Sequence, residues 1–264
     1  MTIVIPSYQR LDHINALLDS VETATAGREA PPIDVVVVLD GSTDGSREHL
    51  ELRRRDFPVP LTVVWQANAG PAAARNRCMD AARGRLVWML DDDMLIDRGA
   101  MERHREWDRD IASILMGPCE IRSNEFTATQ AQSWYDARHE ALGRSRFVKD
   151  PGLLAFANTS APKELMRKHR FDERFRGYGM EDLDLAVRLT DAGVTVAFDP
   201  AAAVRHAFTP SPLERLRKLR EEGVNRVRFV ALHPDRREVI FEAEPGRFVA
   251  TLRRLQRPAM SRPL

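Results

Sequence analysis

Three consecutive aspartates, Asp91, Asp92 and Asp93, follow an apolar segment, residues 85–90, that is typical of a strand. Because side chains alternate along a strand, we expect Asp91 and Asp93 to share one side and Asp92 to point away. Two carboxylates at the open end of a strand form an anionic oxygen site that suits Mg²⁺ or Mn²⁺, and such an ion suits a diphosphate. The structural alternative is a solvated acidic turn or the N-cap of a helix.

A second acidic pair, Glu181 and Asp182, begins an expected helix after a segment in which two glycines flank Tyr178. The glycines allow close approach of another backbone or a ligand. Adjacent carboxylates behind such a loop suit a general base, with one accepting a hydroxyl proton and the other orienting a sugar. Acids in a first helical turn are also favoured by the helix dipole, so a structural role stays open.

Three further side chains have both a functional and a structural interpretation. Asp40 follows a valine-rich segment, 33–39, that is expected to be a buried strand. It could accept a hydrogen bond from a base N–H or a ribose hydroxyl, or be an ordinary turn residue. Tyr8, after the first apolar run, could stack on a nucleobase or cover the sheet edge. Arg75, more than one turn inside an expected helix over 71–83, could lie on the helix surface or bridge to nearby acids.

The histidines are less specific signals. His206 follows a segment with strand character and could supply a nitrogen ligand to a Mn²⁺ site, although a lone histidine is more often structural. Asp184 and Arg188 have the spacing of an ion pair on a helix surface. Three other histidines are expected to be surface residues: His139, His169 and His233.

The elements that must position these residues alternate between strand and helix in the first half of the chain. This alternation predicts a parallel, doubly wound sheet, in which ligands bind beyond the carboxyl ends of the strands. The expected strands there are 3–5, 33–39, 61–65 and 85–90, and the expected helices are 11–21, a polar helix ending near 55, and 71–83. The second half is less regular, with expected strands over 111–116, 153–157 and 194–198 and a helix over 180–192.

Composition excludes several classes of protein. The 264 residues carry 40 basic and 39 acidic side chains, so a net charge of +1 argues against a nucleic-acid binder. Two cysteines cannot form a disulfide framework and fit a reducing compartment. Neither a signal peptide nor an apolar run long enough to span a bilayer is recognised, so we expect a cytoplasmic protein.

The C-terminal segment, 211–264, differs in charge from the rest, with 13 Lys/Arg and 7 Asp/Glu. We expect a basic, partly helical appendage that carries an apolar stripe. Packing onto the remainder of the chain is the plain interpretation. The alternatives are a contact in a homo-oligomer, or a basic amphipathic surface that touches an anionic membrane or a lipid-linked acceptor.

Taken in order, the motifs resemble those of GT-A-fold glycosyltransferases and are most similar to the large family two of nucleotide-sugar transferases. They are Ile-Val-Ile-Pro-Ser-Tyr at 3–8, the valine strand with Asp-Gly-Ser-Thr-Asp-Gly at 36–45, Asn-x-Gly with Ala-Arg-Asn at 68–76, and Leu-Asp-Asp-Asp at 90–93. The resemblance covers about 1–210. It implies an α/β, Rossmann-like, doubly wound mixed sheet with a nucleotide-binding half, 1–95, and an acceptor-binding half, 96–210.

The resemblance also implies roles for individual residues. Asp182 is similar to the family's general base, with Glu181 beside it. A divalent cation, Mn²⁺ or Mg²⁺, would be held by Asp91, Asp93 and His206. The residues implied to line the nucleotide site are Pro6, Tyr8, Arg10, Asp40, Arg75, Asp91 and Asp92.

The reaction implied is a single displacement with inversion. Asp182 would deprotonate an acceptor hydroxyl, which attacks the anomeric carbon of a nucleoside-diphosphate sugar, with a UDP-sugar as the favoured donor. The acceptor would be a carbohydrate, a lipid-linked molecule or a small molecule. The alternatives are a nucleotidyltransferase that makes a nucleotide-sugar, a non-catalytic nucleotide-sugar binder, and a retaining enzyme on the same fold.

Overall fold

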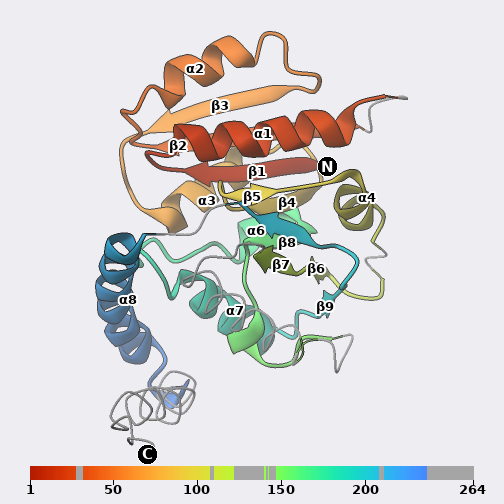
Figure 1. The fold of residues 1–264 in the computed structure, drawn as a ribbon. Coiled ribbons are helices and arrows are strands. Elements are labelled where there is room, and N and C mark those ends of the chain that lie inside the picture. The colour runs from red at the N-terminus through yellow and green to blue at the C-terminus, as the bar shows by residue number, and fades with distance from the viewer. Residues whose placement is uncertain are drawn as a thin grey trace, which may run out of the picture.

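The protein is described by a computed structural model. The structure describes residues 1–27, 32–107, 110–121, 140, 142, 147–207 and 211–236. The predicted strand and helix alternation is present, and the fold class is confirmed as a mixed α/β sheet covered by helices (Figure 1).

The main sheet has seven strands in the order β3-β2-β1-β4-β8-β6-β9. The strands β3, β2, β1 and β4 are parallel, β8 is antiparallel to both of its neighbours, and β6 is parallel to β9. Their bounds are β1 (Thr2–Ser7), β2 (Asp34–Asp40), β3 (Leu61–Gln66), β4 (Leu86–Leu90), β6 (Ile114–Met116), β8 (Asn158–Pro162) and β9 (Val196–Phe198).

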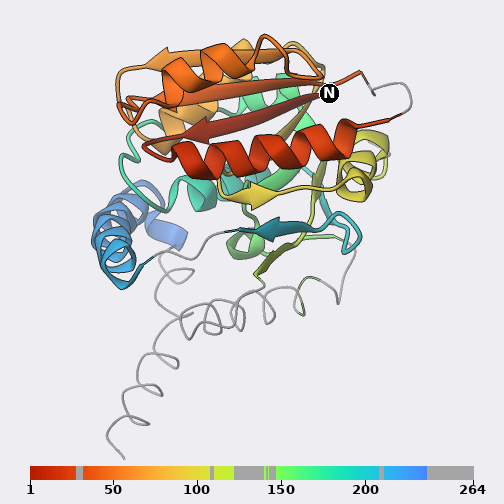
Figure 2. The same ribbon diagram turned by 45° about the horizontal axis from the view of Figure 1, so that its top comes forward.

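Alternation along the central strands separates two cores. On β2, Val35 and Val37 pack with the buried face of α1 (Leu11–Thr25), whereas Val36 and Val38 pack with α3 (Pro71–Ala81) on the other side. Figure 2 shows α1 lying along β1 over one face of the sheet. Further helices are α2 (Ser46–Arg53), α4 (Arg98–Glu106), α6 (Lys163–Lys168) and α7 (Glu181–Asp191), and short 3-10 turns lie at η1 (Pro151–Leu153) and η2 (Pro234–Arg236).

A small second sheet brings a late segment back to the triple aspartate. It consists of β5 (Met94–Leu95), β10 (Val204–His206) and β7 (Cys119–Ile121) in the order β5-β10-β7. His206 pairs with Met94, and the Ala207 N–H donates to the Asp93 carbonyl over 2.8 Å. The antiparallel pairing therefore fixes His206 beside Asp93.

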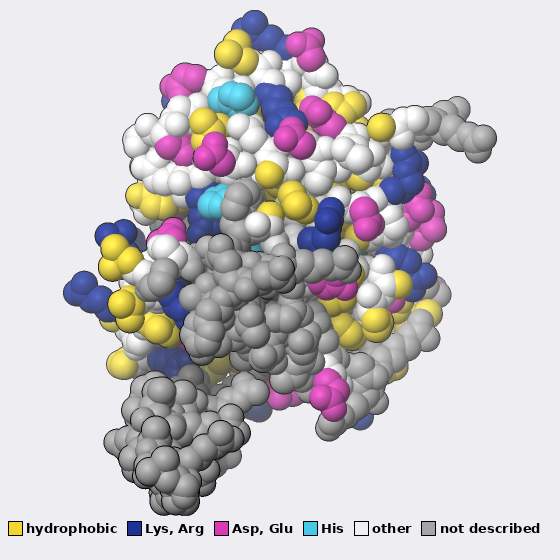
Figure 3. All heavy atoms as spheres, viewed as in Figure 1, with side chains coloured by type: hydrophobic (Ala, Val, Ile, Leu, Met, Phe, Trp, Pro, Cys, Tyr) yellow, Lys and Arg dark blue, Asp and Glu magenta, His cyan; other side chains and the backbone are white. Residues whose placement is uncertain are grey.

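The helix α8 (Pro212–Leu232) is the described part of the basic C-terminal segment. It begins with a capping box between Ser211 and Glu214, and its Phe229 packs in a buried cluster with Phe175 and Val187. Figures 1 and 3 show it at the left side of the molecule. This contact agrees with the interpretation that the segment packs onto the remainder of the chain. The boundaries of the predicted domains stay predictions.

None of the helices within the described ranges combines the length and the hydropathy needed to cross a bilayer.

Two expected strands are corrected. The strand expected over 153–157 is wrong, because Pro151–Leu153 forms the 3-10 turn η1 and the strand β8 starts only at Asn158. The sequence of β8, Asn-Thr-Ser-Ala-Pro, has no apolar alternation, and buried polar contacts stabilise it instead: the Asn158 Nδ2 donates to the Pro118 and Ala202 carbonyls. The strand expected over 111–116 is shorter and starts at Ile114.

Candidate active site

The triple aspartate lies in a turn at the carboxyl end of β4. Because the strand ends at Leu90, strand alternation no longer governs the side chains that follow, and the expected pairing of Asp91 with Asp93 is not observed. Asp91 instead contacts Arg75 on α3, while Asp92 and Asp93 both contact Arg10. The turn therefore presents acids to two different arginines.

The pair Asp92 and Asp93 is buried at the edge where β1 and β4 end. Arg10 Nη1 lies 3.1 Å from Asp92 Oδ1 and 3.0 Å from Asp93 Oδ2, and Ser7 Oγ donates to Asp92 Oδ2 over 2.7 Å. Burial, opposed by the Arg10 charge and aided by the Asp93 charge, raises the pKa of Asp92 to about 7. Sequence reasoning missed Ser7, although its place after the first apolar run was a signal.

Arg75 connects the two acidic motifs. The residue is 7% exposed, and its guanidinium donates through Nη2 to Asp91 Oδ1 and through Nη1 to Glu181 Oε1, each over 2.9 Å. Of the two structural interpretations of Arg75, the bridge to nearby acids is the one observed, and its contact with a nucleotide stays a prediction. The contact joins residues far apart in sequence and brings the end of β4 next to the start of α7.

The acids of α7 follow a backbone in unusual conformations. Gly177, Gly179 and Met180 have φ values of 75°, 88° and 74°, the left-handed region that favours glycine. This turn directs Glu181 toward Arg75. Burial, aided by the Asp182 charge and opposed by the Arg75 charge, raises the pKa of Glu181 to about 7.

Asp182 is half-buried at the same helix terminus. Its Oδ2 accepts a hydrogen bond from the Phe156 N–H over 3.1 Å, which orients the carboxylate. The contact holds this carboxylate one residue from the Arg75 contact, and the role of Asp182 as general base stays a prediction.

Asp40 is 4% exposed and orders the loop that leads into α3. Its Oδ1 accepts from Gln66 Nε2 and the Ala69 N–H, and its Oδ2 accepts from the Gly70 N–H over 2.8 Å. The structural interpretation of Asp40 is therefore satisfied by the protein alone. A contact with a base or ribose through its remaining lone pairs stays a prediction.

Pro6 and Tyr8 lie at the same carboxyl edge of the sheet. Pro6 pairs with Val38, and Tyr8 follows with its side chain 51% exposed. The neighbouring Gln9 N–H donates to Ser42 Oγ over 3.0 Å, so the end of β1 is tied to the turn after Asp40. The exposed ring is free of the sheet core, as a stacking surface requires.

The proposed metal ligands are only partly assembled. His206 Nε2 lies 3.5 Å from Asp93 Oδ1, a buried oxygen that accepts no hydrogen bond within the described residues. Asp91, by contrast, is directed to Arg75. No group of three His, Cys, Asp or Glu residues arranged to hold a metal is found in the part of the chain that the structure describes. The Asp93–His206 pair has the donor chemistry for Mn²⁺, and the full ligand set stays a prediction.

Beyond the acids, α8 supports the Gly-Tyr-Gly turn in a way that the sequence did not indicate. The Asn225 Nδ2 lies 3.0 Å from the Arg176 carbonyl, 3.2 Å from that of Tyr178 and 2.9 Å from that of Gly179. The available signal was the single asparagine among the apolar and charged residues of the stripe.

His233, expected at the surface, is mostly covered and is corrected. Its Nε2 lies 2.8 Å from Asp184 Oδ1, and its ring packs on Phe229. Arg188 forms the expected pair with Asp184, but the acid is 2% exposed rather than on the surface. His139 lies outside the described residues.

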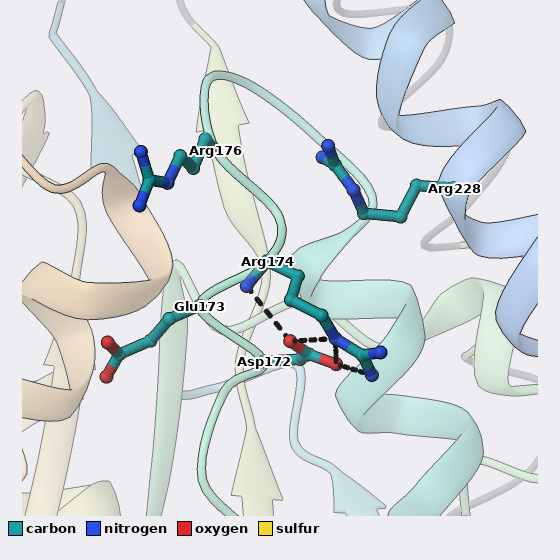
Figure 4. A pocket seen from close by; sticks show the side chains of 5 residues that line it. All are labelled: Asp172, Glu173, Arg174, Arg176 and Arg228. Carbon is teal, nitrogen blue, oxygen red and sulfur yellow. Dashed lines mark hydrogen bonds and ion pairs between the residues drawn. The ribbon is translucent and has the colours of Figure 1, made fainter.

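A cavity of about 560 Å³ lies between α8 and the segment before the Gly-Tyr-Gly turn (Figure 4). None of the predicted site residues lines it. Arg174 pairs with Asp172 there, as the dashed lines in Figure 4 mark. Its lining residues are Asp172, Glu173, Arg174, Arg176 and Arg228.

The mixed sheet, with acids at the ends of its central strands, defines a protein of the GT-A class. The mannosyltransferase PcManGT from Pyrobaculum calidifontis, solved with GDP-Man and Mn²⁺, has a TM-score of 0.64 and 21% identity, covering 82% of this chain and 59% of that one. Staphylococcus aureus TarS 1-349, solved with UDP-GlcNAc, has a TM-score of 0.60 and 17% identity, and the match covers 80% of this chain and 59% of that one. At these identities the likeness is one of fold.

The sequence comparisons define the family. The family described as Glycosyl transferase family 2 matches residues 2–168, which is more than half of the chain. The chain therefore belongs to glycosyl transferase family 2, and the resemblance stated from the motifs is confirmed.

Curated relatives match over shorter stretches. The putative teichuronic acid biosynthesis glycosyltransferase TuaG of Bacillus subtilis is 30% identical over 107 residues, covering 40% of this chain and 41% of that protein. The uncharacterized glycosyltransferase YibD of Escherichia coli is 31% identical over 93 residues, which cover 35% of this chain and 26% of that protein. The matched part thus spans about a quarter to two fifths of these relatives.

Proposed function

We propose that this protein transfers a sugar from a nucleoside-diphosphate sugar to an acceptor hydroxyl with inversion of configuration. The observation that carries the proposal is the Arg75 bridge, because it places the acids at the end of β4 and those at the start of α7 in one site. Family membership agrees with glycosyl transfer.

The donor's nucleotide would lie along the carboxyl ends of β1, β2 and β4. Tyr8 offers an exposed ring for the base, and Asp40 a buried carboxylate beside the same turn. Arg10 and Arg75 supply positive charge next to the acids, where a diphosphate would approach. Asp92 is the last of the proposed nucleotide-site residues. It accepts hydrogen bonds from Ser7 and from Arg10, and so it would orient the Arg10 guanidinium.

The residues that would hold a divalent cation are Asp91, Asp93 and His206. When bound there, a cation supplies neutralisation of the leaving diphosphate. The Asp93–His206 contact of 3.5 Å supports this assignment for two of the three residues. For Asp91, ligation requires release of the 2.9 Å contact with Arg75.

Proton transfer would be carried out by Asp182. Its carboxylate, oriented by the Phe156 N–H, accepts the proton of the acceptor hydroxyl as the oxygen attacks the anomeric carbon. Glu181, whose pKa is raised to about 7 by burial, stays with Arg75 and limits the negative charge beside the base.

A UDP-sugar is the favoured donor, with a GDP-sugar as the competitor. The neighbour TarS was solved with UDP-GlcNAc and the neighbour PcManGT with GDP-Man and Mn²⁺. The acceptor is a carbohydrate, a lipid-linked molecule or a small molecule. We place the protein in the cytoplasm, because its two cysteines fit a reducing compartment.

Product analysis tests the proposal. The protein is incubated with UDP-, GDP-, dTDP- and CDP-sugars, Mn²⁺ and a panel of sugar acceptors, and the released nucleotide product and the anomeric configuration of the new glycosidic bond are measured. Nucleoside diphosphate with inverted sugar supports the proposal. Pyrophosphate released in a separate incubation with nucleoside triphosphates and sugar 1-phosphates would instead identify a nucleotidyltransferase. A retained configuration would identify a retaining enzyme, and nucleotide binding without turnover a non-catalytic binder.

A further inference from the structure

The helix α8 exposes an apolar stripe that its own packing leaves uncovered. Of the eleven exposed large apolar side chains found among the described residues, five lie on this helix. They are Leu213 (58% exposed), Leu216 (64%), Leu219 (51%), Val224 (59%) and Val227 (73%). At 3.6 residues per turn, Leu213, Leu216, Val224 and Val227 fall on one side of the helix.

The opposite side of α8 makes its intramolecular contacts. Asn225 and Phe229 are fully buried there, and Glu221 Oε2 accepts from the Tyr178 N–H over 2.8 Å. Burial of Phe229 and Asn225 explains why the helix docks on the protein. It does not explain why the outward side is also apolar, and no contact among the described residues covers that side.

The charges of α8 are divided between its two sides. Its acids are used within the protein: Glu214 caps the helix, Glu221 binds the Gly-Tyr-Gly turn, and Glu222 lies against Gly179 and pairs with Arg226. The exposed arginines that border or interrupt the stripe are Arg217 and Arg220. Figure 3 shows hydrophobic and basic side chains next to one another at this edge of the molecule.

We propose that the outward side of α8 is a docking surface for an anionic lipid bilayer. A helix with an apolar stripe bordered by arginines lies in the interface plane, with the apolar side chains in the acyl boundary and the guanidinium groups at the phosphates. A second copy of this chain suits the surface less well. In a two-fold contact Arg220, in the middle of the stripe, would face a like charge.

The surface lies on the side of α8 that does not hold the catalytic turn. Docking therefore leaves the Asn225 contacts with the turn before Glu181 and Asp182 in place. The inference adds a location to the proposed glycosyl transfer and does not require it to be correct.

Vesicle co-sedimentation of the full chain tests the surface. Vesicles of phosphatidylcholine alone are compared with vesicles of equal parts phosphatidylcholine and phosphatidylglycerol. The two arginines at the stripe predict roughly 30-fold tighter binding to the anionic vesicles. The double variant Leu216→Asp/Val227→Asp should bind them at least roughly 10-fold more weakly, because it places charge in the acyl boundary.

The matched control is Leu52→Asp on α2, since Leu52 is 60% exposed and lies outside α8. It should bind vesicles as the wild type does, and all variants should keep the wild-type melting temperature. Equal binding to both kinds of vesicle, or binding to neither, overturns the proposal. So does a wild-type dimer that the double variant turns into a monomer, because that result assigns the stripe to a second copy.

The two proposals fail separately. Vesicle binding is read without donor or acceptor, so it survives if no sugar is transferred. Conversely, Asp182→Asn should co-sediment as the wild type does, and loss of binding in that variant would contradict a docking surface confined to α8.

Discussion

Charge at the candidate site is set by two arginines among five acids. Arg10 holds Asp92 and Asp93, and Arg75 holds Asp91 and Glu181. Buried carboxylates outnumber their guanidinium partners, and burial raises the pKa of Asp92 and of Glu181 to about 7. Such a site gains stability from anything that adds positive charge, whether a proton or a cation.

The raised pKa of Glu181 predicts a pH-dependent stability with a definite sign. Between its ordinary pKa of 4.5 and about 7, the folded protein binds more protons here than the unfolded chain. The free energy of unfolding therefore falls as pH rises through this window, by up to about 3 kcal/mol from this group. Urea denaturation at several pH values should show that Glu181→Gln flattens the decline.

Glu164→Gln is the control for that experiment, because the Glu164 side chain is 77% exposed on α6. Its profile should follow the wild type. If Glu181→Gln and the wild type decline in parallel from pH 5 to 7.5, the buried carboxyl of Glu181 is not the source of the decline.

The variant Asp182→Asn tests the proposal that Asp182 is the general base. The amide keeps an oxygen for the Phe156 N–H but cannot accept the acceptor's proton, so kcat should fall roughly 10²–10⁴-fold while nucleotide binding is unchanged. Steady-state kinetics and calorimetric titration with nucleotide measure the two quantities. Asp191→Asn, at a 52% exposed position on the same helix, should be fully active. Normal turnover of Asp182→Asn would remove the assignment.

At the scale of elements, α8 contacts the Gly-Tyr-Gly turn that precedes Asp182, the proposed general base. Asn225 is fully buried and its amide meets three carbonyls of this turn. Removing this amide takes two N–H donors away from three partly buried carbonyls, which costs more than one lost hydrogen bond. We therefore assign Asn225 a positioning role.

Asn225→Ala should lower the free energy of unfolding by about 1–3 kcal/mol and speed amide exchange in residues 176–180. If the turn is loosened, kcat should fall more than nucleotide affinity, because the nucleotide contacts lie on other elements. Val227→Ala on the exposed side of the same helix should change neither the free energy of unfolding nor the amide exchange of residues 176–180. Unchanged exchange in Asn225→Ala would show that the glycines alone define the turn.

The elements also show where sequence reasoning succeeds and where it stops. The valines of β2 are buried on both faces and are recognised from composition, and so is the helix α3 that begins at Pro71. The strand β8 has polar residues, and its position rests on long-range hydrogen bonds from Asn158, so no local pattern reveals it. The orientation of Asp91 was mispredicted because it depends on where β4 ends.

At the scale of the whole molecule, the site is assembled from segments that the sequence separates. Motif order predicts that Asp40 and the triple aspartate meet at one sheet edge, because parallel strands place their carboxyl ends together. The contact of Arg75 with Glu181 crosses from one half of the chain to the other and depends on how α7 packs. Such a contact follows from tertiary packing and not from any local pattern.

Because the site joins both halves, a bound nucleotide should stabilise the entire fold. At a nucleotide concentration of 100 times Kd the expected gain is about 2.7 kcal/mol, or roughly 5–10 °C in Tm for a domain of this size. A thermal-shift series with UDP, GDP, dTDP and CDP, each with and without Mn²⁺, measures it.

Asp93→Asn should retain the nucleotide shift but lose the additional shift due to Mn²⁺, since Asp93 Oδ1 is the buried oxygen next to His206. Asp12→Asn, the same charge change at an exposed position on α1, should keep both shifts. An undiminished Mn²⁺ shift in Asp93→Asn would move the cation away from β4 and leave Arg10 and Arg75 as the partners of the diphosphate.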